Sequence, residues 1–257
     1  MRLDAAVAAR EGITRSQARG LILAGRVRIG GAPATKPGTA VRDAGAVEIV
    51  QSQRFVSRGG EKLEAALEAF EIDVSGAHVL DVGASTGGFT DCLLQRGAAA
   101  VTAVDVGYGQ LAWSLRNDPR VTVMERTNFR HLTDDAFEKP FDFVTIDTSF
   151  ISLRTIVRRA VAFVAPEGAI VALVKPQFEA GRERVGGGGV VRDPEVHRAV
   201  LREVRNAMEP LGMPMVALMA SPLLGPAGNR EFLALLRRAG TPVADHTIDA
   251  VVAEPVA

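Results

Sequence analysis

The sequence of 257 residues contains one cysteine and no long apolar run. A single cysteine excludes an internal disulfide framework and any zinc site built from several cysteines. A helix that crosses a bilayer needs about 20 mainly apolar residues, and no uninterrupted apolar run of that length occurs here. The N-terminal segment alternates apolar and charged side chains, which is not typical of a secretory signal. We therefore expect a cytoplasmic protein that does not bind a membrane.

Hydrophobic residues make up 47% of the sequence and charged residues 23%, which suits a globular chain of one or two domains. The formal net charge is +0, but the charges are unevenly divided along the chain. Residues 1–58 contain ten Lys or Arg and four Asp or Glu, whereas residues 59–257 contain 20 and 26. This asymmetry predicts that the basic N-terminal part contacts a polyanion.

Residues 1–50 predict a small α+β domain with two helices and two strands. The second helix begins with a capping box, in which Thr14 is followed three residues later by Gln17. Alternating apolar residues and glycine turns indicate the strands. The expected elements are a helix over residues 3–9, a helix from the capping box to Gly25, and strands over residues 27–29 and 47–50.

Arginines are concentrated on this N-terminal domain. Arg15 and Arg19 lie one helical turn apart and therefore share a face. Such a cluster is typical of phosphate binding, and a solvated charged face is the alternative. The domain resembles the S4-type RNA-binding domain in the motifs Arg2-Leu3-Asp4, Ser16-Gln17-Ala18, Leu21-Ile22, Gly25-Arg26-Val27 and Lys36-Pro37. This resemblance implies binding to structured RNA by shape and phosphate contacts, and the expected contact residues are Arg2, Arg15, Arg19, Arg26 and Arg28.

Strand and helix patterns alternate from residue 77 onward and predict a parallel, doubly wound α/β sheet. We expect residues 51–58 to form a linker and residues 59–257 to form this second domain. The carboxyl ends of its strands should form the edge where ligands bind. The expected strands cover residues 78–82, 100–105, 121–125, 141–147, 169–175, 213–219 and 231–236, and the expected helices include residues 89–96, 110–116, 156–164 and 194–208.

A glycine-rich turn, Gly83-Ala84-Ser85-Thr86-Gly87-Gly88, follows the first of these strands. Its spacing differs from the G-x-G-x-x-G of dinucleotide binders, and the absence of a following Lys-Ser/Thr excludes a P-loop. The turn therefore suits a nucleoside without a phosphate chain. Asp105 ends the next strand, 22 residues after Gly83, where a carboxylate can accept hydrogen bonds from ribose hydroxyls. A generic tight turn with a solvent-facing acid is the alternative.

The turn and the acid together resemble the S-adenosylmethionine (SAM) pocket of Rossmann-like methyltransferases. The resemblance implies that Asp105 holds the ribose of the cofactor. Acidic residues suit this cofactor because its sulfonium is positively charged. The residues expected at its methionine end are Asp81, Gly83, Ala84, Ser85 and Gly87.

Charged residues stand at the tips of two apolar strands, namely Asp147 and Lys175. A charge at such a tip costs desolvation unless it is paired, so these two residues are natural partners. Glu231 begins a late strand. The apolar stripe Leu63, Ala66, Leu67 and Phe70 predicts a further helix, and Lys62, in its first turn, can reach the same edge. Only four of the 30 basic residues are lysines, and a partly buried lysine can accept a proton from a hydroxyl. Two lysines and two acids favour methyl transfer to a ribose 2′-OH without a metal, and a structural ion pair is the alternative.

Longer motifs around these residues resemble the TlyA family of rRNA methyltransferases, whose catalytic domain is FtsJ-like. The family's Lys-Asp-Lys-Glu tetrad falls on Lys62, Asp147, Lys175 and Glu231. The resemblance implies SAM-dependent 2′-O-methylation of cytidine in rRNA of the large subunit or of both subunits, with ribosomal subunits as partners. The family often has Trp in the linker, where this chain has Phe55. The matching motifs are SRGGEKL (57–63), DVGASTGGF (81–89), DVGYGQL (105–111), IDTSFISL (146–153), LVKPQFE (173–179) and GNREF (228–232).

Several features leave alternatives open. Arg126 and Arg130 follow the third strand and either bind rRNA phosphates or are simply exposed. The glycines of residues 186–189 belong to a lid over RNA or to a disordered surface loop. The alternatives to an enzyme are a non-catalytic RNA-binding assembly factor and, because relatives are often labelled haemolysins, a membrane-lytic protein. We expect a monomer.

Overall fold

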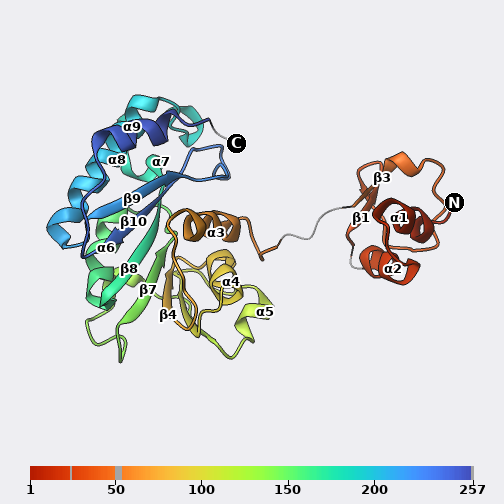
Figure 1. The fold of residues 1–257 in the computed structure, drawn as a ribbon, viewed down its shortest axis with the longest axis horizontal. Helices are drawn as coiled ribbons and strands as arrows, with labels where there is room; N and C mark the ends of the chain where they lie inside the picture. Colours follow the sequence, from red (N-terminus) through yellow and green to blue (C-terminus); the bar gives the residue numbers. More distant parts are fainter. Residues whose placement is uncertain (24, 50–53, 256–257) are drawn as a thin grey trace. The chain divides into compact units, whose positions relative to one another are not determined.

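The computed structural model describes residues 1–23, 25–49 and 54–255. The chain divides into two compact units, Met1–Gln53 and Arg54–Ala257, which are drawn in Figure 1. Each unit contains its own cluster of buried hydrophobic side chains.

The N-terminal unit packs two helices on a three-stranded antiparallel sheet of order β2-β1-β3. The predicted capping box is present, because the backbone N–H of Thr14 donates to Gln17 Oε1 at 2.9 Å and the backbone N–H of Gln17 donates to Thr14 Oγ1 at 3.3 Å. The short strand β2 was not predicted, and the predicted strand end at Val50 lies outside the described residues. The elements are α1 (Leu3–Glu11), α2 (Arg15–Leu23), β1 (Val27–Ile29), β2 (Ala32–Pro33), the 3-10 helix η1 (Ala44–Ala46) and β3 (Val47–Ile49).

The second unit is built on a seven-stranded sheet of order β6-β5-β4-β7-β8-β10-β9. Its strands are Val/Ile/Leu-rich because helices cover both faces, as expected for a largely parallel sheet. The predicted α/β, Rossmann-like fold is therefore confirmed. The strands are β4 (His78–Val82), β5 (Ala100–Val104), β6 (Val121–Met124), β7 (Phe141–Ile146), β8 (Val164–Val174), β9 (Met215–Ala220) and β10 (Phe232–Arg237).

The expectation that every strand is parallel was wrong for β10, which runs antiparallel to both β8 and β9. No helix separates β9 from β10, and a chain that turns back without a crossover gives an antiparallel pair. The reversal matters for the site. Phe232, the first residue of β10, pairs with Val174, the last residue of β8, so the start of β10 lies at the edge where β8 ends.

Helices α3, α4 and α5 cover one face of the sheet, and α6, α8 and α9 cover the other (Figure 1). The expected helix at residues 110–116 is shorter than predicted, and α9 was not predicted. Among the described residues, no helix is both long and apolar enough to span a bilayer. The helices are α3 (Gly59–Ala69), α4 (Gly88–Gln95), α5 (Trp113–Arg116), α6 (Leu153–Ala160), α7 (Pro176–Glu179), α8 (Pro194–Met208) and α9 (Asp245–Ala253), and the 3-10 turns are η2 (Phe129–His131), η3 (Val161–Phe163), η4 (Arg182–Arg184), η5 (Gly187–Gly189) and η6 (Glu209–Leu211).

Part of the expected linker packs within the second unit. Phe55 is buried, and the backbone N–H of Val56 donates to the Asp91 carboxylate at 2.8 Å. Phe55 lies so close to α3 that a Cβ on Gly60 would be 2.3 Å from its ring, so this approach requires glycine. Residues 51–53 of the expected linker lie outside the described residues. The Phe55 contacts fix the start of α3 and hence the position of Lys62.

Candidate active site

The glycine-rich turn between β4 and α4 brings the chain close to two neighbours. Gly83 has φ +86°, and a Cβ there would lie 2.5 Å from the carbonyl oxygen of Asp147. Gly87 has φ +95°, and a Cβ there would lie 2.3 Å from a methyl group of Leu115. Both positions need glycine for backbone conformation and for space. Gly83 therefore sets the distance between the turn and Asp147, whereas Gly87 faces α5 rather than a cavity.

Two adjoining cavities open at the carboxyl edge of the sheet. The first measures about 530 Å³ and the second about 390 Å³. Their sizes fall in the range of small-ligand sites, which is about 300–1,000 Å³. The residues that border both cavities are Gly83, Ser85, Asp147, Ser149 and Phe150. A ligand in one cavity can thus reach a ligand in the other across the glycine turn.

The second cavity has features that suit a nucleoside. Asp105 lines it, and two backbone N–H groups orient the carboxylate, from Ser85 to Oδ2 at 2.8 Å and from Gly107 to Oδ1 at 2.6 Å. Each carboxylate oxygen can accept a further hydrogen bond, as two ribose hydroxyls would require. Apolar walls from Val106 and Phe129 suit a flat base. The residues present therefore fit the adenosine part of SAM, and the first cavity meets this one at Ser85.

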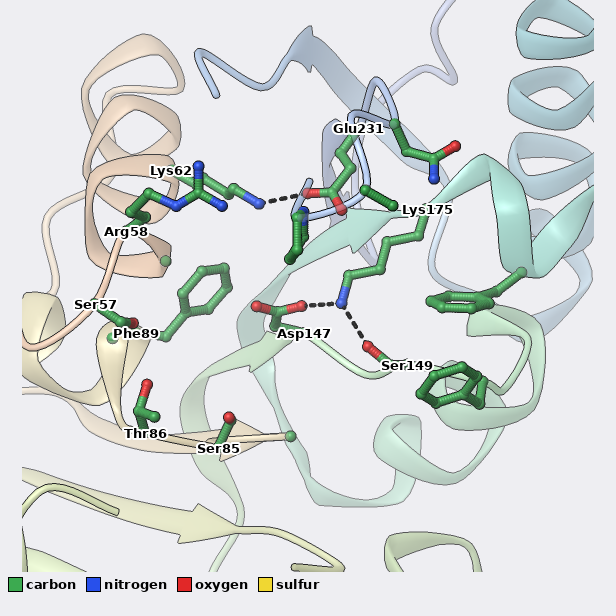
Figure 2. Close-up of a pocket in the computed structure, with 18 of the residues that line it drawn as sticks. Ser57, Arg58, Lys62, Ser85, Thr86, Phe89, Asp147, Ser149, Lys175 and Glu231 are labelled. Atoms are coloured by element: carbon green, nitrogen blue, oxygen red, sulfur yellow. Dashed lines mark hydrogen bonds and ion pairs between the residues drawn. The ribbon is translucent and has the colours of Figure 1, made fainter. Parts of the chain in front are cut away.

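Five charged side chains line the first cavity, and four of them form two ion pairs (Figure 2); the five are Arg58, Lys62, Asp147, Lys175 and Glu231. Lys62 Nζ lies 2.5 Å from Glu231 Oε2, and both side chains are buried. Lys175 Nζ lies 2.6 Å from Asp147 Oδ1 and donates to Ser149 Oγ at 3.0 Å.

The four residues of the ion pairs come from four separate elements: Lys62 from α3, Asp147 from the end of β7, Lys175 from the end of β8 and Glu231 from the start of β10. The fold brings all of them to one edge, so the two ion pairs face the same space. A structural ion pair alone would not need a cavity beside it. The arrangement provides two amines and two carboxylates around a polar ligand group, together with the Ser149 hydroxyl.

Asp81 is, after Gly87, the second of the residues expected at the cofactor that the structure places away from both cavities. Its side chain is fully buried, lines neither cavity, and accepts hydrogen bonds from Thr90 Oγ1 at 2.6 Å and Thr145 Oγ1 at 2.9 Å. Burial raises the pKa of this carboxyl to about 6. Asp81 thus joins β4, β7 and α4 beneath the glycine turn, whereas Gly83, Ala84 and Ser85 line the first cavity.

The raised pKa of Asp81 predicts a specific pH dependence of stability. Between its ordinary pKa of 3.8 and about 6, the folded protein keeps this proton while the unfolded chain loses it. The free energy of unfolding therefore falls by about 2–3 kcal/mol as pH rises through this window. We expect Asp81→Asn to abolish this decrease and to be more stable than the wild type at pH 7, as measured by urea unfolding. The exposed Glu138→Gln is the control, and equal pH profiles for wild type and Asp81→Asn would contradict the prediction.

Two features of the site had not been anticipated from the sequence. Phe150 is 90% exposed with φ +63°, a strained backbone for a bulky residue, and its ring centroid lies 5.0 Å from that of Phe178 at the cavity wall. Glu179 is buried at the end of α7 and connects it to the start of α6. Its carboxylate accepts hydrogen bonds from Ser152 Oγ at 2.7 Å and from the backbone N–H of Leu153 at 2.5 Å. Both belong to motifs already noted, but their contacts depend on how these segments pack in the fold.

The arginines expected to bind RNA occupy two regions. Arg130 lines the second cavity, and the guanidinium of Arg126 stacks 4.0 Å from the ring of the exposed Tyr108. In the N-terminal unit, Arg26 and Arg28 are exposed. The remaining three, Arg2, Arg15 and Arg19, all contact the carboxylate of Asp4.

Comparisons with known proteins agree with this architecture. Residues 55–238 match the FtsJ-like methyltransferase family, and residues 1–47 match the S4 domain. The chain is 56% identical over 241 residues to the 16S/23S rRNA (cytidine-2′-O)-methyltransferase TlyA of Mycobacterium tuberculosis, covering 92% of this chain and 89% of the relative. It is 41% identical to Hemolysin A of Brachyspira hyodysenteriae, covering 91% of this chain and 98% of the relative.

A solved structure has a similar fold over nearly the whole chain. A hemolysin-named protein from Streptococcus thermophilus superimposes with a TM-score of 0.76 at 42% identity, covering 98% of this chain and 94% of that chain. The family matches span both units, and the second cavity fits the adenosine part of SAM. The chain belongs to the FtsJ-like methyltransferase family and, with its N-terminal S4 domain, to the TlyA group of SAM-dependent methyltransferases.

Proposed function

We propose that the protein methylates the 2′-oxygen of a cytidine ribose in ribosomal RNA. The observation that carries the proposal is the meeting of Lys62, Asp147, Lys175 and Glu231 in one cavity beside a SAM-sized site. The close relative that is named for this activity, with 56% identity, supports the same substrate. SAM supplies the methyl group from its sulfonium, and no metal is needed because the leaving group is a neutral thioether.

Within this proposal, Lys175 reacts as the neutral amine: its nitrogen accepts the proton of the substrate hydroxyl as the methyl–oxygen bond forms and the methyl–sulfur bond breaks. Asp147 and Ser149 contact the Lys175 amine directly and fix its position. A positioned general base contributes about 10²–10⁴-fold to such a step. Lys62 and Glu231 form the second wall of the cavity and position the ribose from the opposite side.

The aromatic pair at the cavity wall fits a nucleotide turned out of its RNA stack. Phe150 and Phe178 line the first cavity together with Lys175, and an exposed aromatic ring can stack with a base. A base held there would leave its ribose near Lys175 and Asp147. The strained backbone at Phe150 is consistent with a functional position.

The S4 domain and the arginines near the second cavity would hold the rRNA by its phosphates. We expect the double substitution of Arg15 and Arg19 by Ala to weaken rRNA binding and to reduce the salt slope of log K by about 1 to 2. Filter binding over a series of salt concentrations measures both quantities. The control is Arg237→Ala, an exposed residue at the opposite edge of the sheet. An unchanged slope in the double variant would contradict phosphate contacts by this helix.

Transfer of tritium from labelled SAM to ribosomal subunits tests the activity itself. The proposal predicts incorporation into rRNA, and tight rRNA binding without incorporation would instead indicate a non-catalytic assembly factor. Whether 16S rRNA, 23S rRNA or both are modified is decided by mapping 2′-O-methylated nucleotides in rRNA from cells with and without the protein.

A further inference from the structure

Asp4 lies at the centre of the arginine cluster in the N-terminal unit. Its side chain is fully buried, yet it accepts hydrogen bonds from three arginines. Arg2 donates to both carboxylate oxygens, at 3.1 and 3.0 Å, while Arg15 and Arg19 donate one bond each, both at 3.2 Å. The arginine side chains themselves remain 52%, 58% and 57% exposed. Each guanidinium is therefore held on one side and open to solvent on the other.

The three arginines come from different parts of the unit. Arg2 precedes α1, and Arg15 and Arg19 stand one turn apart on α2. Three guanidinium groups this close repel one another, and each long side chain loses rotamer freedom when it binds a phosphate. One carboxylate compensates one of the three charges and leaves the cluster at +2. It also fixes three flexible side chains before RNA arrives, which lowers the ordering cost of binding.

We propose that Asp4 is a positioning residue for RNA binding: it holds Arg2, Arg15 and Arg19 as a preformed surface for RNA phosphates. The inference rests on the proposed rRNA substrate. The hydrogen bond from Arg2 is the main cause that keeps the pKa of Asp4 well below its usual range, so the carboxylate stays charged at every physiological pH.

A simple count of charges predicts the opposite of this proposal. Asp4→Asn makes the unit more basic by one charge, which should strengthen binding to a polyanion. If Asp4 acts by positioning, the same substitution weakens binding, because an amide offers one acceptor oxygen in place of two. Glu48→Gln is the matched control, since Glu48 is exposed on β3 and its loss adds the same charge without contacting the cluster.

The experiment is filter binding of the full-length protein to purified 16S and 23S rRNA at several salt concentrations. We expect Asp4→Asn to bind about tenfold more weakly than the wild type, a loss of about 1.4 kcal/mol. Glu48→Gln should bind equally or more tightly. Binding by Asp4→Asn that equals or exceeds the wild type would overturn the proposal, whereas failure of the wild type to bind rRNA would instead refute the rRNA substrate.

A second variant covers the case in which Asp4→Asn unfolds the N-terminal unit, which thermal unfolding would reveal. Arg19→Lys keeps both the charge and the buried carboxylate but loses the planar fork that meets Asp4. We expect it to lose severalfold in rRNA affinity, while Arg42→Lys, at an exposed position of the same unit outside the cluster, changes affinity by less than twofold. Equal losses in these two variants would also overturn the proposal. Retained SAM binding in every variant shows that the second unit is intact.

Discussion

Lys175→Ala is expected to lower the rate of methyl transfer by about 10³-fold while leaving SAM affinity unchanged. The Lys175 amine contacts Asp147 and Ser149 in the first cavity, but it does not line the second cavity, where the nucleoside features lie. The loss should therefore fall on the chemical step and not on cofactor binding. Single-turnover transfer of labelled methyl groups and calorimetric titration with SAM measure the two effects separately.

Lys139→Ala is the matched control for this prediction, because Lys139 is an exposed lysine outside both cavities. It should retain wild-type activity. Full activity of Lys175→Ala would remove the role assigned to this amine. A large loss of SAM affinity in that variant would show that the residue supports the cofactor site instead.

Gly83→Ala should damage both the proposed cofactor site and the proposed catalytic site. A Cβ at this position would overlap the carbonyl oxygen of Asp147, so either the glycine turn or the end of β7 must move. The left-handed backbone adds about 1 kcal/mol of strain. We expect SAM affinity to fall at least about tenfold and methyl transfer about 10²-fold or more, since a displacement of 1 Å in a catalytic group has effects of this size.

Gly76→Ala separates the effect of the left-handed backbone from that of the steric overlap with Asp147. Gly76 has a similar φ of +73°, but no atom lies within 4 Å of the position that its Cβ would take. The Gly76→Ala variant should lose about 1 kcal/mol of stability and keep the activity of the wild type. If Gly83→Ala behaved like Gly76→Ala, the close approach of the turn to Asp147 would have no functional importance.

Local patterns in the sequence were sufficient to place most of the elements. The period of apolar residues located the strands β4 to β8, and the capping box at Thr14 located α2, because these signals depend on near neighbours in the chain. The direction of β10 was missed because alternating patterns do not distinguish parallel from antiparallel pairing. The chain nevertheless reverses there, and this brings Glu231 to the edge that holds Asp147 and Lys175.

Contacts between distant residues explain what the sequence could not show. The sequence predicts Asp81 to be a strand-end acid near the cofactor, yet its carboxylate accepts hydrogen bonds from the hydroxyls of Thr90 and Thr145. The sequence predicts Gly87 to be part of a ligand-binding loop, yet the side chain of Leu115 occupies the space beside its Cα. Asp4 belongs to a recognised motif, but its convergence with three arginines depends on how α1 and α2 pack.

The chemical identity of the product tests the central claim most directly. Unmodified rRNA is incubated with the protein and SAM, digested to nucleosides and analysed by liquid chromatography with mass spectrometry. An active centre of two amines and two carboxylates acting on a ribose hydroxyl predicts 2′-O-methylcytidine, and Lys175→Ala should form it about 10³-fold more slowly. A methyl group on the cytosine base, or no methylated nucleoside at all, would contradict the account.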